Sequence, residues 1–201
     1  MKLRYSPASP YVRKVMIVAL EGGLAERIEK VPTAAVPVKV NEVLQAENPL
    51  VKLPSLTTDA GETLYDSPVI CEYLDSLHSS ARLFPAAGPA RWTALRRQAL
   101  GDGILDAAIL IRYETTVRPK ELQWADWVDG QMRKVRGALD ALEDERFDGA
   151  FDIGTLTIGC ALGYLDFRFP TEDWRKTRPK LATWFSEISR RPSMKATEPQ
   201  G

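Results

Sequence analysis

The chain has 201 residues, of which 44% are hydrophobic and 27% are charged, and its 27 Lys and Arg are balanced by 27 Asp and Glu. This composition is typical of a globular protein with one large or two small domains, and the lack of a basic excess argues against nucleic acid as a partner. One His and two distant Cys, without a C-x-x-C motif, do not predict a metal site.

The lengths of the apolar stretches indicate where in the cell we expect the protein. The first residues are charged and lack a long apolar segment, so we expect no signal peptide. No stretch approaches the roughly 18 apolar residues that a membrane-spanning helix needs. We therefore expect a cytoplasmic protein with reduced thiols and no membrane partner.

The first 78 residues alternate between strand and helix signals. A helix is predicted directly after Pro10 and ends at Gly22-Gly23, a short helix is expected over 40–46, and another follows Ser67-Pro68. Short strands are predicted over 2–5, 28–31, 55–58 and 63–65, the last two as a hairpin. The order is βαβαββα, with the first β-α-β unit parallel and the hairpin antiparallel.

The second half of the chain is helical throughout. Residues 79–88 are rich in Ser, Ala, Gly and Pro, which predicts a linker. A long helix is expected from Trp92 to about Thr116, and a strongly apolar helix around residues 158–165 is expected at the buried centre. The predicted domains are therefore 1–78, the linker 79–88, and 89–201.

Ser9-Pro10 marks the start of the first helix. Pro is favoured in the first helical turn, which places Ser9 at the N-cap. A purely structural cap is the commoner meaning of such a pair. The alternative is that the Ser9 hydroxyl and the positive end of the helix dipole stabilise a bound thiolate. Ser6-Pro7 is a rival for that role, but helical periodicity begins directly after Pro10.

Leu53-Pro54 precedes a predicted strand. Pro cannot donate to a strand ladder, so the structural interpretation is an edge-strand proline in the trans form. The functional alternative is a cis-proline that leaves the backbone N–H and C=O of Leu53 free to pair with a peptide ligand.

Asp66-Ser67-Pro68 reads as a second helix start. It is again either a cap alone or a receptor for an amino acid group. In the second case Ser67 and the open backbone amides take an α-carboxylate, while Asp66 pairs with an α-ammonium group.

Segments 9–15, 48–56 and 64–74, in this order, resemble glutathione S-transferases, and 152–168 (DIGTLTIGCALGYLDFR) is similar to the core helix of that family. The resemblance covers the whole chain and looks like a bacterial subgroup. It implies an α/β plus all-α protein, with an N-terminal thioredoxin-like domain that binds glutathione and a C-terminal helical-bundle domain that completes an electrophile site.

The resemblance also implies residues for the glutathione site. Ser9 matches the catalytic position of the Ser- and Cys-type classes. Leu53 and Pro54 match the residue whose backbone pairs with glutathione and its cis-proline. Asp66 and Ser67 match the acidic-Ser pair that holds the γ-glutamyl group.

Further positions follow from the same resemblance. Lys39 and Lys52 are candidates for binding the glycyl carboxylate, although a solvated lysine is the commoner meaning at Lys39. Tyr11, Arg112 and Tyr113 are the residues expected to line the electrophile pocket.

Two positions depart from the family pattern. Val51 stands where the family often has Gly before Lys. Asp152 and Thr155 stand where the core helix usually has Ser or Thr followed by Asp, which inverts the polarity of the cap. Asp also caps helices well, so we expect the fold to be unaffected.

The resulting prediction is a homodimeric glutathione transferase with glutathione as co-substrate and no metal. Ser9 would stabilise the thiolate. The thiolate is then conjugated to a hydrophobic electrophile, or it reduces an electrophile or a peroxide. Serine rather than cysteine argues against thiol-transfer chemistry. The alternatives are a non-enzymatic binding or adapter protein and a specialised isomerase or dehalogenase. Cys71, Cys160 and His78 are expected to be structural.

Overall fold

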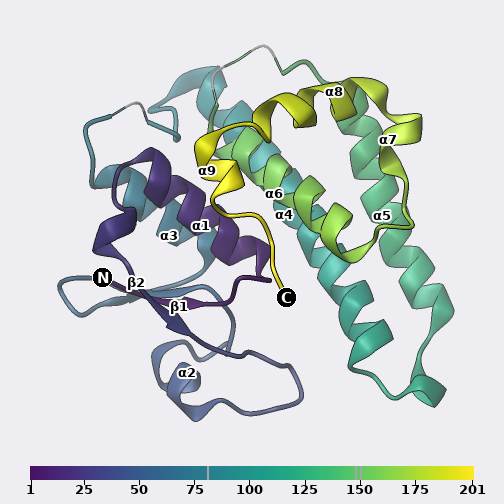
Figure 1. Ribbon diagram of the computed structural model, residues 1–201, viewed down its shortest axis with the longest axis horizontal. Helices are drawn as coiled ribbons and strands as arrows, with labels where there is room; N and C mark the ends of the chain where they lie inside the picture. The colour runs from purple at the N-terminus through teal and green to yellow at the C-terminus, as the bar shows by residue number, and fades with distance from the viewer. Residues whose placement is uncertain (81, 148, 150) are drawn as a thin grey trace. The chain divides into compact units, whose positions relative to one another are not determined.

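The computed structural model describes residues 1–80, 82–147, 149 and 151–201, and the chain forms two compact units (Figure 1). Unit 1 comprises Met1–Ala86 together with Pro192–Gly201, and unit 2 comprises Ala87–Arg191. Among the described residues, no helix is both long and apolar enough to cross a membrane.

Unit 1 is built on a mixed sheet, which has four strands in the described part of the chain, in the order β2-β1-β3-β4. The strands are β1 (Lys2–Tyr5), β2 (Glu29–Pro32), β3 (Ser55–Thr57) and β4 (Thr63–Leu64). β2 runs parallel to β1, whereas β3 is antiparallel to both β1 and β4. The predicted parallel β-α-β unit and antiparallel hairpin are thereby confirmed.

The helices of unit 1 complete the predicted βαβαββα order. Those in the first 86 residues are α1 (Pro10–Glu21), α2 (Glu42–Glu47) and α3 (Ser67–Ser76), with a short 3-10 turn at Ala25–Arg27. α1 is the most buried of them, because it contacts both α3 and α9 (Pro192–Lys195). Burial of its aliphatic side chains, at about 1.5–3 kcal/mol each, fixes the helix that Ser9 begins.

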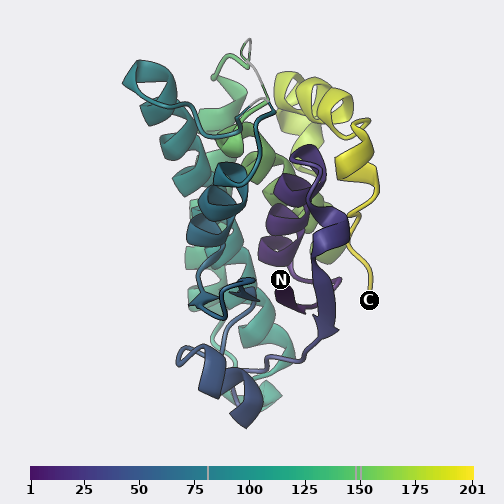
Figure 2. The ribbon, with the colours of Figure 1, turned by 90° about the vertical axis from the view of Figure 1, so that its left-hand side faces the viewer.

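The last ten residues differ from the predicted domain boundaries. The sequence placed 89–201 in one domain, but Pro192–Gly201 belongs to unit 1 and the division before unit 2 falls between Ala86 and Ala87. Figure 2 shows α9 and the residues after it beside α1. The physical reason is a set of long-range hydrogen bonds, such as Arg13 Nη2 to the Met194 carbonyl (3.1 Å), which have no local sequence signal.

Unit 2 is an all-helical domain. Its helices are α4 (Gly88–Thr116), α5 (Ala125–Glu143), α6 (Ile153–Arg168), α7 (Trp174–Thr177) and α8 (Pro179–Ile188), with a 3-10 turn at Lys120–Leu122. α4 contacts both α5 and α6. α6 is buried over nearly its whole length, which confirms the prediction that it is the centre of the domain.

Close approach of α4 and α6 depends on glycines. A Cβ at Gly154 would lie 2.5 Å from the Ala94 carbonyl oxygen, and one at Gly101 would lie 2.9 Å from Thr157 Cγ2. Real Cβ atoms do not come so close, so the two backbones can touch only because these positions lack side chains. The packing therefore fixes the start of α6 firmly against α4.

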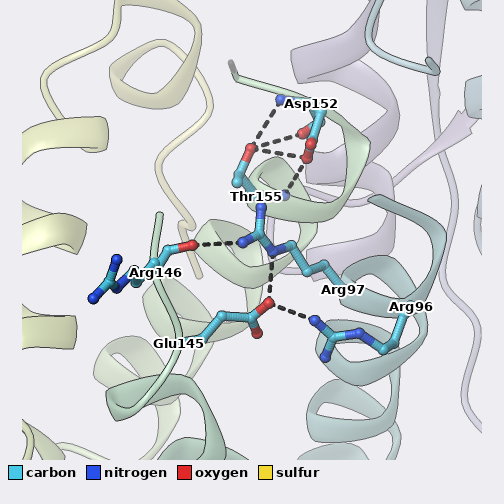
Figure 3. A network of polar contacts seen from close by, with 6 residues as sticks. All are labelled: Arg96, Arg97, Glu145, Arg146, Asp152 and Thr155. Atoms are coloured by element: carbon cyan, nitrogen blue, oxygen red, sulfur yellow. Dashed lines mark hydrogen bonds and ion pairs between the residues drawn. The ribbon is translucent and has the colours of Figure 1, made fainter. Parts of the chain in front are cut away.

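The start of α6 is closed by a capping box, shown in Figure 3. The Thr155 N–H donates to Asp152 Oδ1 (2.8 Å), and the Asp152 N–H donates to Thr155 Oγ1 (2.9 Å). In the same view, Arg97 of α4 donates to Glu145 Oε1 (3.0 Å) and to the Arg146 carbonyl (2.7 Å). The inverted cap expected from the sequence is therefore fully formed.

Candidate functional site

The register of the sheet brings three separate segments to one edge of unit 1. Arg4 pairs with Ser55, and Leu56 pairs with Leu64. Because both pairs of strands are antiparallel, the chain leaves β1, enters β3 and leaves β4 on the same side. We call this edge, made of residues 6–9, 53–54 and 65–67, the site edge.

Ser9 occupies the N-cap of α1, as predicted from Ser9-Pro10. Its backbone is extended (φ −83°, ψ 119°), and its Oγ accepts a hydrogen bond from the Val12 N–H (3.3 Å). The Ser9 N–H donates to the Ser6 carbonyl (3.1 Å). A hydroxyl has one donor in addition to its acceptor lone pairs. Ser9 can therefore cap the helix and still donate its proton to a bound group.

The Leu53–Pro54 peptide is cis rather than trans. Pro54 is buried, and Leu53 lies outside the strand ladder because β3 begins at Ser55. The backbone N–H and C=O of Leu53 thus face no strand partner in the sheet register.

The loop before Leu53 is held by Asn48, which the sequence analysis did not single out. Asn48 is 1% exposed; its Nδ2 donates to the Lys52 carbonyl (3.0 Å) and its Oδ1 accepts from the Leu50 N–H (3.0 Å). Val51 in this loop has a φ of 52°. Left-handed backbone strains a β-branched residue, which explains why the family often has Gly at this position.

Asp66 is the N-cap residue of α3, and Ser67 and Pro68 follow in the first turn. Among the described residues, the Asp66 side chain makes no capping hydrogen bond. Asp66 is exposed, whereas Ser67 is only 2% exposed. The Tyr65–Asp66 peptide is also cis. The helix start therefore presents uncapped backbone amides, a free carboxylate and a buried hydroxyl together, which suits an α-amino acid group.

The two lysines predicted for the glycyl carboxylate lie on loops. Lys39 is exposed in the segment after β2, where its N–H donates to the Val36 carbonyl (3.0 Å). Lys52 is exposed in the loop that Asn48 holds. Nothing in their geometry selects one lysine over the other.

The residues predicted for the electrophile pocket come from both units. Tyr11 lies on α1 in unit 1, two residues after Ser9, and is half-buried. Arg112 and Tyr113 lie near the end of α4 in unit 2. Burial raises the pKa of Tyr113 above its usual value, an effect that the charge on Arg112 opposes.

Two residues of α6, which sequence reasoning missed, belong with Arg112. Burial raises the pKa of Tyr164, and the positive charges of Arg112 and Arg168 oppose that shift. Burial lowers the pKa of Arg168, and repulsion from Arg112 lowers it further. Unit 2 therefore gathers two guanidinium groups and two phenols where α4 meets α6. The only sequence signal was the four-residue spacing of Tyr164 and Arg168 on one helix face.

The remaining reactive side chains are packed. Cys71 and Cys160 are buried, and neither forms a disulfide within the described residues. The His78 Nδ1 accepts or donates in a 2.7 Å hydrogen bond with Ser80, and its ring lies where a Cβ at Gly22 would have to be. In the part of the chain that the structure describes, no group of three His, Cys, Asp or Glu side chains could hold a metal ion.

Known proteins match this chain along its length. Residues 3–82 match the N-terminal domain of glutathione S-transferases, and residues 125–187 match their C-terminal domain. The GST-like protein YibF of Escherichia coli (strain K12) is 36% identical, over 99% of this chain and 98% of that protein.

Solved structures match as well. A glutathione transferase family member from Pseudomonas fluorescens Pf-5, with bound glutathione, is 47% identical with a TM-score of 0.97, over 100% of this chain and 99% of that one. A second structure of a family member from that organism holds S-(propanoic acid)-glutathione; it is 46% identical with a TM-score of 0.92, over 100% of both chains.

Proposed function

This chain belongs to the glutathione S-transferase family, and from that premise we propose that it binds glutathione in unit 1 and activates its thiol for attack on a hydrophobic electrophile or a peroxide. The observation that carries the proposal is the site edge, where one sheet register gathers the Ser9 cap, the cis Leu53–Pro54 peptide and the uncapped start of α3.

Each part of the site edge has a group of glutathione to bind. The backbone of Leu53, next to cis-Pro54, pairs with the cysteinyl peptide group. The carboxylate of Asp66 pairs with the γ-glutamyl ammonium, and Ser67 with the open amides of α3 takes the γ-glutamyl carboxylate. Lys52 or Lys39 pairs with the glycyl carboxylate.

Ser9 is the proposed catalytic residue, because its hydroxyl can donate a hydrogen bond to the thiolate at the positive end of α1. Lowering a thiol pKa from about 8.5 to about 6.5 raises the thiolate fraction at pH 7 from roughly 3% to roughly 76%. That shift corresponds to about 2.7 kcal/mol, which one charge-assisted hydrogen bond and a helix end together can supply. The N-cap position of Ser9 favours it over Ser6, one turn earlier.

For the electrophile, we propose contacts with Arg112 and Tyr113 of unit 2. Arg112, near the end of α4, carries a guanidinium group that can pair with a carboxylate on the substrate. The relative that holds S-(propanoic acid)-glutathione supports this substrate class. An electrophilic acid should therefore be a better substrate than its amide, and Arg112→Met should abolish that preference in kcat/KM without changing glutathione affinity.

Two alternatives of a different kind remain distinguishable by experiment. A binding or adapter protein would bind glutathione weakly or not at all and would not accelerate any reaction. An isomerase would bind glutathione normally and regenerate it beside a rearranged substrate, and a dehalogenase would release halide from its substrate without leaving a conjugate. Mass analysis of the products from a panel of electrophiles and peroxides separates these outcomes.

We propose a homodimer, by analogy with the family. Such dimers have a two-fold interface in which each subunit presents the same surface. Light scattering should give about twice the chain mass of 22.4 kDa. A mass equal to a single chain at micromolar concentration would contradict the proposal.

The test of the catalytic proposal is the titration of bound glutathione in matched serine variants. Ser9→Ala should lower conjugation by about one to two orders of magnitude at pH 7 while glutathione affinity stays nearly unchanged. The thiolate absorbance of bound glutathione should titrate at a higher pH in Ser9→Ala and at the wild-type pH in Ser6→Ala. A wild-type titration in Ser9→Ala would remove Ser9 from the mechanism, and a shift in Ser6→Ala alone would assign the role to Ser6.

A further inference from the structure

Residues 192–201, here called the strap, run along α1 from its last turn back to the loop that precedes it (Figures 1 and 2). At one end, the Ser193 hydroxyl donates to Glu21 Oε1 (2.5 Å), at the last residue of α1. At the other end, the Gln200 N–H donates to the Pro7 carbonyl (3.3 Å). A Cβ at Gly201 would lie 3.9 Å from that of Ala8. The strap thus reaches the Ser6–Ser9 loop of the site edge.

Arg13 joins the middle of the strap to α1. Its Nη2 donates to the Met194 carbonyl (3.1 Å) and its Nε to Thr197 Oγ1 (3.4 Å). Thr197 Oγ1 in turn donates to the Ser193 carbonyl (2.8 Å), which keeps the strap compact. On the other side, the Arg13 N–H donates to the carbonyl of Ser9 (3.0 Å). This is the main-chain hydrogen bond of the first turn of α1, so the Arg13 side chain attaches the strap one turn after the N-cap residue.

The burial of Arg13 indicates that its contacts with the strap have a positioning role. Arg13 is 7% exposed, and its Nη1 has no hydrogen-bond partner among the described residues. A buried guanidinium with an unsatisfied nitrogen contributes less to stability than a packed apolar side chain would. Such a residue is better explained by the geometry that it imposes than by the stability that it adds.

We propose that the strap positions the Ser9 hydroxyl, with Arg13 and the Gln200 N–H as its two points of attachment to the start of α1. This inference rests on the proposed function, in which Ser9 donates to the glutathione thiolate. A misplacement of about 1 Å at such a group lowers rates substantially. Arg13 and the strap are positioning elements and do not themselves contact the reacting atoms.

The sharpest test removes the backbone N–H that attaches the strap to the Pro7 carbonyl. Gln200→Pro deletes the donor to the Pro7 carbonyl, because proline has no backbone N–H. Gln200→Ala is the matched control, since it removes the exposed side chain and keeps the N–H. We expect Gln200→Pro to lower kcat about threefold and to raise the pKa of the bound thiol by about half a unit, with KM for glutathione within about twofold. Gln200→Ala should match the wild type.

The second attachment is tested in the same assay. Thr197→Val keeps the shape of the side chain and removes the acceptor for Arg13 Nε, so it should shift kcat and the thiol pKa in the same direction as Gln200→Pro. Arg13→Met should have the largest effect, about tenfold in kcat, because it removes both strap contacts. Should Arg13→Met fail to fold, Thr197→Val alone shows whether the contact between Arg13 and the strap affects kcat and the thiol pKa.

Amide hydrogen exchange, measured in the protein without glutathione, tests the role of the strap independently of the proposed function. Exchange at residues 6–12 should be faster in Gln200→Pro than in Gln200→Ala. Equal exchange and equal kcat in these two variants would overturn the proposal. If the wild type does not bind glutathione, the proposed function fails together with the catalytic part of this inference. Faster exchange in Gln200→Pro would then show only that the strap orders the loop before α1.

Discussion

The helix starts of α3 and α6 both carry Asp at the N-cap, but they satisfy their backbone amides in opposite ways. At α6, the Asp152 carboxylate accepts from the Thr155 N–H, and the Asp152 N–H donates to the Thr155 hydroxyl oxygen in return. At α3, the Asp66 side chain makes no such hydrogen bond within the described residues. One start is closed by the chain itself, and the other is open.

The difference comes from the third residue of each helix. Thr155 has a hydroxyl that completes the capping box, whereas the equivalent residue of α3 is Val69, which is 47% exposed and has no polar group. Pro68 also removes one N–H from the first turn of α3. The identity of the cap residue therefore does not decide whether a helix start is closed or open; the neighbouring residues decide it.

The largest expected effect is a loss of glutathione affinity when the Asp66 carboxylate is removed from the open helix start. Asp66→Ala should weaken glutathione binding by about 1.5–3 kcal/mol, the range for hydrogen bonds to charged groups. The free energy of unfolding should change by less than about 0.5 kcal/mol, because the side chain is exposed and caps nothing. Calorimetry and denaturant unfolding of the same preparation check both halves; a stable variant with wild-type affinity would contradict the assignment.

Removal of the closed cap should do the reverse. Asp152→Ala should lower the free energy of unfolding by about 1–2 kcal/mol, the upper part of the range for a lost N-cap, since the Asp152 carboxylate accepts from both the Thr155 N–H and the Thr155 hydroxyl. Denaturant unfolding measures this loss. Glutathione affinity of the folded variant should equal that of the wild type, and a matching loss of affinity would mean that the two helix starts are not independent.

A substitution in the strained loop beside Leu53 should have a smaller effect and should raise, not lower, the free energy of unfolding. Val51→Gly should raise the free energy of unfolding by about 0.5–1 kcal/mol, because glycine adopts a φ of 52° without the penalty that a β-branched residue incurs. Thermal unfolding checks the result. A destabilised Val51→Gly would show that the Val51 side chain contributes more through packing than its backbone costs.

The smallest effect should come from closing the open start. Val69→Thr gives α3 the Asp-x-x-Thr spacing of α6, so a capping box can form and compete with glutathione for Asp66 and the open amides. We expect a gain in unfolding free energy of about 0.5 kcal/mol and a loss of glutathione affinity of similar size. Val69→Ala, which cannot form the box, is the control and should not lose affinity.

Local signals explain how much of the fold the sequence could predict. Prolines placed the starts of α1 and α3, apolar periodicity identified α6, and the Asp59-Ala60-Gly61 turn identified the hairpin. The last ten residues could not be assigned, because Arg13 reaches Met194 across 181 positions of sequence.

The candidate site was predictable to the same extent. Ser9 and Asp66 were placed at helix starts by Pro10 and Pro68, and a cis Leu53–Pro54 peptide was one of the two alternatives considered. The supporting role of Asn48 depends on loop geometry that no short pattern specifies. Tyr164 was missed because its link to Arg112 exists only after α4 and α6 have packed.

Calorimetric titration of the wild-type chain with glutathione at pH 7 tests the central claim most directly, since every role given to the site edge assumes that glutathione occupies it. The account predicts saturable heat with one site per chain and a dissociation constant below about 1 mM, the upper end of the usual range of KM values for enzyme substrates. Absence of binding at millimolar glutathione would contradict it.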